Sequence, residues 1–132
     1  MISRRFFAGC ALCVAGLKAT NVSAQSPGLV RNQLNRIEEP GDKLATIQML
    51  VDIDANFYVP PHTHPGVETA YILEGGGTFQ MKGKSDRAVG PGDTFQVPSE
   101  TTHALKAGPK KTKVLSIYVV DKAKPLASPS SF

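Results

Sequence analysis

Short alternating runs of apolar and polar residues, bounded by glycine turns, constrain the fold of this 132-residue chain more than any other feature. Every second residue from Ile47 to Ile53 is apolar, and a period of two is typical of a β-strand with one buried face. Later runs are separated at Gly75–Gly77, Lys82–Lys84 and Gly90–Gly92, and the triple glycine is interpreted as a hairpin turn. No amphipathic helix alternates with the runs. The pattern therefore predicts an all-β antiparallel sandwich or barrel.

The predicted strands are spread along one domain with a single core. They cover residues 44–59, 68–73, 78–81, 87–89, 94–97, 103–107 and 114–120. Residues 25–42 precede them as an N-terminal arm, in which 29–37 is either a free arm or an added edge strand. A helix is the alternative there, because Leu34 and Ile37 are three apart.

All three histidines of the chain fall into a pattern suited to a metal ion. His62 and His64 are two apart, so an extended strand projects both imidazoles from one face, and a short turn then leads to Glu68. His103 follows a short apolar strand that can return it to the same place. Histidine and carboxylate ligands suit manganese, iron, cobalt, nickel, copper or zinc. The alternative is that these are packed or surface residues without a shared role.

These residues carry a resemblance to the cupin family. The first cupin motif, G-x5-H-x-H-x3-E-x6-G, is matched from His62 to Gly75, although Asn56 stands at its leading glycine. The second, G-x5-P-x-G-x2-H-x3-N, is matched by Gly92, Pro98 and His103. There, Glu100 replaces the inner glycine and Ala107 the asparagine, which leaves the shape of the turn before His103 open.

The resemblance implies a small antiparallel jelly-roll barrel over residues 43–121, with a metal in its mouth. One divalent ion, of manganese, iron, nickel, copper or zinc, is expected on His62, His64, Glu68 and His103. Four such ligands leave two positions open on an octahedral ion, enough for a chelating substrate or for substrate and dioxygen. Glu68 is also the candidate catalytic residue, accepting a proton if it leaves the metal.

Two classes of function follow from this site. The first is a metal-dependent oxidoreductase, similar to cupin dioxygenases, acting on a small oxygenated organic molecule. The second is a non-catalytic periplasmic protein that binds a metal or small molecule, because cupins host both. No Gly-x-Ser-x-Gly elbow or phosphate-binding loop indicates another chemistry.

The wall of the pocket is less constrained than the metal ligands. Ala70 and Ile72 alternate with Glu68 and are expected on its face. Four larger apolar residues either line the pocket or fill the core: Phe57, Phe79, Met81 and Phe95.

The first 24 residues are interpreted as an export signal, which places the mature protein in the periplasm or outside the cell. Arg4 and Arg5 precede an apolar run of 12 residues, Phe6–Leu17, and Val22–Ala24 forms a small-residue cleavage site. The segment resembles a twin-arginine signal. An ordinary secretory signal is the alternative, and a lipid anchor at Cys10 is a weaker one.

Removal of this segment changes the composition in two ways. Both cysteines leave with it, so disulfides and thiolate ligands are excluded from the mature chain. Three basic residues also leave, and the formal charge falls from +4 to +1. A nucleic-acid partner is therefore not expected.

A homodimer is expected, through the 29–37 segment or the apolar strand 114–120. The alternative is that both faces of that strand are buried within one barrel. The C-terminal tail, residues 122–132, has no core-forming pattern and is predicted to be disordered or to lie across a neighbouring subunit.

Overall fold

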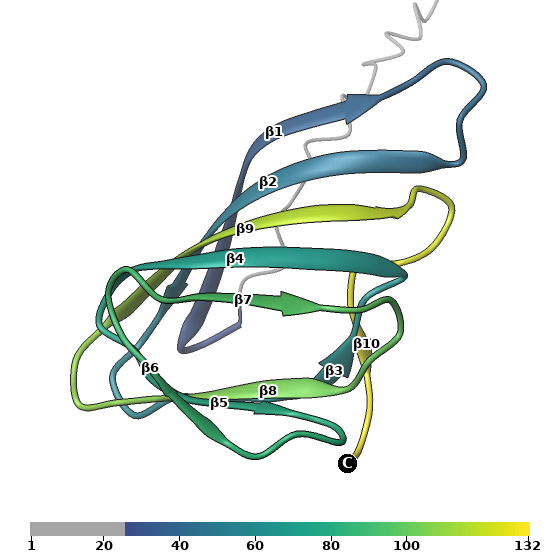
Figure 1. The fold of residues 1–132 in the computed structure, drawn as a ribbon. Helices are drawn as coiled ribbons and strands as arrows, with labels where there is room; N and C mark the ends of the chain where they lie inside the picture. The colour runs from purple at the N-terminus through teal and green to yellow at the C-terminus, as the bar shows by residue number, and fades with distance from the viewer. Residues whose placement is uncertain (1–25) are drawn as a thin grey trace, which may run out of the picture.

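Two antiparallel β-sheets face each other in the computed structural model, which describes residues 26–132 (Figure 1). The described part of the chain contains no helix, so the predicted all-β jelly roll is confirmed. The proposed export signal lies outside the described residues. Within residues 26–132 there is no helix that could span a lipid bilayer.

The first sheet has the order β1-β2-β9-β4-β7. Its strands are β1 (Leu29–Glu38), β2 (Leu44–Ile53), β4 (Gly66–Glu74), β7 (Thr94–Val97) and β9 (Thr112–Asp121). The segment left open between arm, helix and strand is thus the edge strand β1, paired along β2 with a bulge between Gln33 and Asn35. β9 lies between β2 and β4, so its edges are already paired within the chain.

The second sheet has the order β10-β3-β8-β5-β6. Its strands are β3 (Tyr58–Thr63), β5 (Gly77–Met81), β6 (Arg87–Val89), β8 (His103–Ala107) and β10 (Ser128–Pro129).

The core fills the space between the two sheets, and strand alternation produces it. In β9 the buried residues Val114, Tyr118 and Val120 alternate with residues on the outer face. Phe79 and Phe95 come from opposite sheets, and their rings stack with centroids 4.3 Å apart. Burying one such side chain stabilises the fold by roughly 1.5–3 kcal/mol.

The residues expected beside Glu68 are buried with it: Ala70 and Ile72 are 1% and 0% exposed. Of the four larger residues left between pocket and core, Phe79 and Phe95 are core residues that also reach the pocket. Phe57 and Met81 are partly buried at the edge of the core.

Two predictions about chain reversals were wrong. The predicted strand 44–59 is interrupted, because β2 ends at Ile53 and β3 begins at Tyr58 in the other sheet. Between them Asn56 has φ 61°, a left-handed conformation that ends an extended strand.

The triple glycine is also not a hairpin turn, since β4 and β5 belong to different sheets. It connects a strand of the first sheet to a strand of the second instead. Gly75 has φ 72°, and a Cβ there would lie 2.2 Å from the Lys111 carbonyl oxygen.

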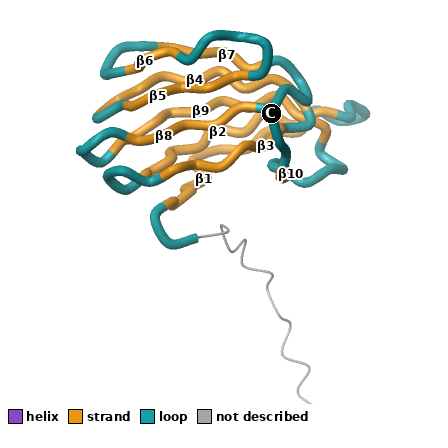
Figure 2. The backbone as a smooth tube through the Cα atoms, turned by 90° about the horizontal axis from the view of Figure 1, so that it is seen from below, coloured by secondary structure: helices purple, strands orange, loops and turns teal. Residues whose placement is uncertain are grey.

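The C-terminal tail also differs from its prediction. It folds back on its own chain, where β10 pairs with the end of β3 through Ser128 opposite Thr63 and Pro129 opposite His62 (Figure 2). Leu126 packs against the core. The hydroxyls of Thr102 and Ser130 lie 2.7 Å apart, which fixes the tail to the turn before β8.

Candidate metal centre

The four predicted ligands lie at one end of the barrel, three of them in strands and one directly after a strand. His62 is in β3 directly opposite His103 in β8, and His64 follows the end of β3. Glu68 projects from β4 in the facing sheet. The structure therefore brings together all four residues that the two sequence motifs had selected.

Their side chains converge closely. The ligand nitrogens of the three histidines lie within 4.8 Å of one another. Oε2 of Glu68 is 3.1 Å from Nε2 of His103 and 3.2 Å from Nε2 of His64. His64, Glu68 and His103 are buried, and His62 is partly buried.

Each imidazole is oriented by a backbone carbonyl. Nδ1 of His62 lies 2.8 Å from the Pro60 oxygen, that of His64 lies 2.7 Å from the Leu126 oxygen, and that of His103 lies 2.9 Å from the Thr101 oxygen. A carbonyl only accepts, so Nδ1 carries the proton in each ring. In a neutral imidazole, the lone pair is then on Nε2.

This arrangement fits a metal ion. Metal-binding histidines typically donate their other ring N–H to a carbonyl or carboxylate, which fixes the tautomer. Nε2 of His64 is buried and, among the described residues, has no hydrogen-bond partner. It lies close to Glu68 without a hydrogen bond, as expected for a lone pair and not an N–H.

Burial sets the electrostatics of the site. It lowers the pKa of His62 to about 4, with a further contribution from the neighbouring His103. Burial would raise the pKa of Glu68, but the close contacts of its carboxylate with His103 and His64 outweigh burial and hold that pKa well below its ordinary value. The Ser116 hydroxyl donates to the other oxygen of Glu68 at 2.8 Å. Glu68 is therefore held as a carboxylate.

The turn before β8 connects two of the histidines. The Glu100 N–H donates to the carbonyl of His64 at 2.9 Å, and the next residue, Thr101, accepts from His103. Glu100 has φ 56°, so the turn keeps a left-handed conformation without the glycine of the motif.

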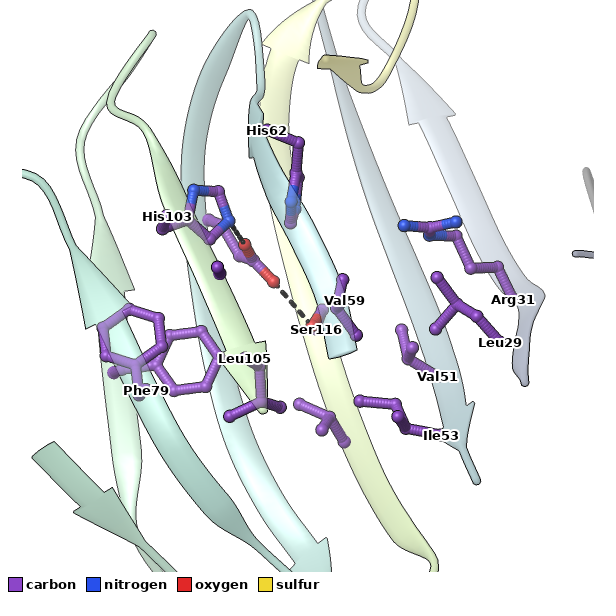
Figure 3. A pocket seen from close by; sticks show the side chains of 14 residues that line it. Leu29, Arg31, Val51, Ile53, Val59, His62, Phe79, His103, Leu105 and Ser116 are labelled. Carbon is purple, nitrogen blue, oxygen red and sulfur yellow. Dashed lines mark hydrogen bonds and ion pairs between the residues drawn. The ribbon is translucent and has the colours of Figure 1, made fainter. Parts of the chain in front are cut away.

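A pocket of about 420 Å³, including its open mouth, extends from these residues into the barrel (Figure 3). His62, Glu68 and His103 form its polar end, and apolar side chains such as Val51, Ile53 and Leu105 form most of its wall. Cupped apolar pockets with a few convergent polar groups are typical of small-molecule sites.

Sequence reasoning missed several residues of the site. Ser116 could have been noticed as a polar residue at an inward position of the apolar strand β9. Tyr118, whose ring centroid lies 4.8 Å from that of His64, shares that face. Arg31 in β1 also lines the pocket. The Leu126 carbonyl gave no sequence signal, because any residue supplies one.

Comparison with known families agrees with this geometry. A model of the cupin domain matches residues 49–118, more than half of the chain. The chain belongs to the cupin family. Its three histidines lie together in the cupin barrel, where they could hold a metal ion.

One curated relative of this cupin is dimethylsulfoniopropionate lyase DddQ of Ruegeria pomeroyi, 40% identical over 57 residues. That match covers 43% of this chain and 28% of the lyase. The crystal structure of the lyase superposes with a TM-score of 0.65 and 30% identity, covering 77% of this chain and 51% of that one. The cupin chain thus spans about half of the lyase or less.

A more distant likeness is to the polyketide cyclase RemF of Streptomyces resistomycificus. The TM-score is 0.62 at 21% identity, covering 80% of this chain and 72% of the cyclase. At that identity the likeness shows the fold alone.

Proposed function

We propose that this cupin is a metal-dependent oxidoreductase of the dioxygenase type, acting on a small oxygenated organic molecule. One divalent ion would be held by His62, His64, Glu68 and His103. The observation that carries the proposal is the set of three Nδ1–carbonyl contacts, which leave Nε2 of each ring free to bind a metal. The three histidines lie together, and Nε2 of His64 and of His103 lie 3.2 and 3.1 Å from the buried carboxylate of Glu68.

The chain's own residues would divide the work as follows. When bound, the metal would polarise the oxygen atoms of a chelating substrate and, if redox-active, make dioxygen reactive. Glu68 is held ionised by its neighbours, among them the Ser116 hydroxyl that donates to it, so it would serve as an anionic ligand first and accept a proton only after leaving the metal. The apolar wall excludes water from the bound substrate.

Tyr118 would not act as a base. Burial raises the pKa of its phenol well above the ordinary value, and the charge of Glu68 raises it further. The phenol therefore stays protonated and packs against His64.

A lyase is a second candidate, favoured by the match to dimethylsulfoniopropionate lyase DddQ. A non-catalytic binding protein is the third, since the cupin fold alone does not decide between them.

One experiment separates the three. The protein is loaded in turn with iron(II), manganese(II), nickel(II), copper(II) and zinc(II), and oxygen uptake is followed with flavonols, catechols and β-diketones. Cleavage of dimethylsulfoniopropionate is measured in parallel under argon. Glu68→Ala is the control expected to be inactive. Thr63→Ala, at the position between His62 and His64, is the matched control expected to keep its activity.

We expect oxygen uptake above the Glu68→Ala level with at least one redox-active metal. Oxygen-independent cleavage under argon would favour the lyase instead. Binding of a panel compound without any turnover would support the binding protein.

We also propose export, on the basis of the arginine pair and small-residue site before Gln25. The mature protein should start at Gln25 in mass spectrometry. Replacing Arg4 and Arg5 with lysine should stop its export if the route is the twin-arginine one. Unchanged export would indicate an ordinary secretory signal, and a retained Met1 would contradict export with cleavage.

A further inference from the structure

A charged side chain faces the inside of the barrel from β1. Arg31 is paired with Val51, which is 7% exposed and belongs to the core, and cross-strand partners project to the same face. Arg31 itself is partly buried, and Figure 3 shows its guanidinium reaching from β1 over the pocket on the side of His62. Charged residues are rarely placed on an inner face without a function or a partner.

Two hollows meet at this residue. The first is the metal-centre pocket, and the second is an open groove between β1, β3 and the C-terminal tail. The two hollows share Leu29, Arg31, Val59 and His62. Among the described residues that line either hollow, Arg31 is the only lysine or arginine. A molecule entering from the groove would pass this charge before it reached the histidines.

Arg31 and the histidines at the other end of the pocket suit different groups of one ligand. A guanidinium is always charged and presents a planar fork that matches a carboxylate with two hydrogen bonds. Most of the residues that line the pocket are apolar, with Val51, Val59 and Leu105 among them. The attraction between the guanidinium and a bound carboxylate is therefore screened less than in water.

We propose that Arg31 binds the carboxylate of an anionic substrate whose oxygen atom at the opposite end reaches the His62–Glu68–His103 end of the pocket. This inference rests on the proposed function and narrows it to small carboxylates that carry a metal-binding hydroxyl or carbonyl group. The groove beside the C-terminal tail is the entrance.

A structural role of the same residue has to be separated from this one. Inward charges on an edge strand such as β1 also discourage pairing with another chain. Arg31 takes part in an interaction within the protein as well. The guanidinium has five N–H donors, so it can keep an internal partner and still bind a ligand. Only the ligand-binding role predicts that a carboxylate binds more weakly when Arg31 is replaced.

The test is calorimetric and uses the zinc-loaded full chain, because zinc does not turn over with oxygen. The probes are 3,4-dihydroxybenzoate and its neutral amide, which carry the same chelating hydroxyls, and the shorter pair 3-hydroxypropanoate and 3-hydroxypropanamide. The variants are Arg31→Gln and Arg31→Lys. Arg36→Gln is the matched control, since Arg36 is an exposed arginine of the same strand.

We expect the acid of at least one pair to bind about tenfold more tightly than its amide in the unmodified chain. In Arg31→Gln the ratio of the acid's affinity to the amide's affinity should fall to about one, and in Arg36→Gln it should not change. Arg31→Lys, which keeps the charge but not the fork, should give an intermediate ratio and serves if the glutamine variant misfolds.

An acid-to-amide ratio near one in the zinc-loaded unmodified chain would overturn the inference and leave the metal site standing. An unchanged ratio in Arg31→Gln or Arg31→Lys would also overturn it, and increased aggregation of Arg31→Gln at that unchanged ratio would assign Arg31 to edge protection. Failure to bind zinc would instead contradict the proposed function. The same titrations on metal-free protein would then test Arg31 alone, with the preference for the acid still expected.

Discussion

Asn56 and Glu100 are the two non-glycine residues of the described chain with left-handed backbone, at φ 61° and 56°. They stand at the two glycine positions of the cupin motifs that this sequence lacks. Asparagine adopts this conformation more readily, because its short polar side chain can hydrogen-bond to the local backbone, whereas for glutamate it costs roughly 1–2 kcal/mol. The turn holding His64 and His103 therefore keeps its shape under strain at one residue.

Glu100→Gly should stabilise the protein. Relief of the left-handed strain exceeds the entropy that a glycine adds to the unfolded chain, for a net gain of about 0.5 kcal/mol. Thermal unfolding should show a melting temperature about 2–4 °C higher. Glu100→Ala, which keeps the Cβ, is the control and should show no gain. An equal rise in both variants would mean that the side chain, and not the backbone, is responsible.

The partly buried His62 should make the metal-free protein less stable in acid. Its folded pKa of about 4 lies below the ordinary 6.5, so between these values the unfolded chain binds more protons at this residue. Stability should therefore fall as pH drops from about 6.5 to 4. After allowance for partial exposure, the loss is about 2 kcal/mol.

Denaturant unfolding at several pH values, with chelator present, measures this slope. His62→Gln removes the titrating group and should flatten the curve above pH 4.5, where Glu68 is still ionised. The same slope in both proteins would show that another group is responsible.

At the scale of elements, the C-terminal tail connects the fold to the site. It supplies the Leu126 carbonyl to His64, pairs β10 with β3 beside His62, and bonds to Thr102 through Ser130. The four predicted ligands lie within residues 62–103, but the orientation of His64 depends on a segment more than 20 residues further along the chain.

Deleting residues 125–132 should weaken metal binding more than it alters the barrel. Loss of an outer-shell partner of a histidine ligand typically costs about 10–100-fold in metal affinity. Competition titration with a chelating dye measures the affinity, and circular dichroism checks the strands. Deleting only Ser131 and Phe132, which are exposed, is the matched control. Unaltered affinity in the long deletion would contradict the role of Leu126.

The sequence predicted those elements whose signal is local. Alternation and glycine turns located β5 to β8, and motif spacing selected the four residues that converge. It failed where the deciding contact is distant or conformational. Asn56 ended a strand that its neighbours would have continued, and the polar tail found its partners only once β3 and the turn at Thr102 were in place.

At the scale of the whole molecule, the outer face of the first sheet carries an apolar surface. In the register, Val67 lies opposite Val119 on this face, and Tyr71 lies opposite Leu115. The side chains of Val67, Tyr71 and Val119 are 43%, 44% and 39% exposed. A contiguous apolar face of this kind is typical of an association surface.

The homodimer stays a prediction, and we place its interface on this face because a sheet face is readily self-complementary about a two-fold axis. The alternative is that both faces of β9 are buried within one barrel. Its inner face is buried, but its outer face is not, because Val119 on that face is exposed. Light scattering at micromolar concentration should give twice the chain mass. Val119→Lys should give the monomer mass, with Lys113→Ala, at the far end of that face, as control. A monomeric unmodified chain would contradict the prediction.

The central claim is that His62, His64, Glu68 and His103 hold one divalent ion per chain. Elemental analysis after metal loading and dialysis tests it most directly. We expect one ion per chain in the unmodified protein and in Thr63→Ala. The His64→Ala, His103→Ala double variant should bind none, while circular dichroism shows its strands intact, because the barrel has an apolar core of its own. A full equivalent of metal in that folded double variant would contradict the account.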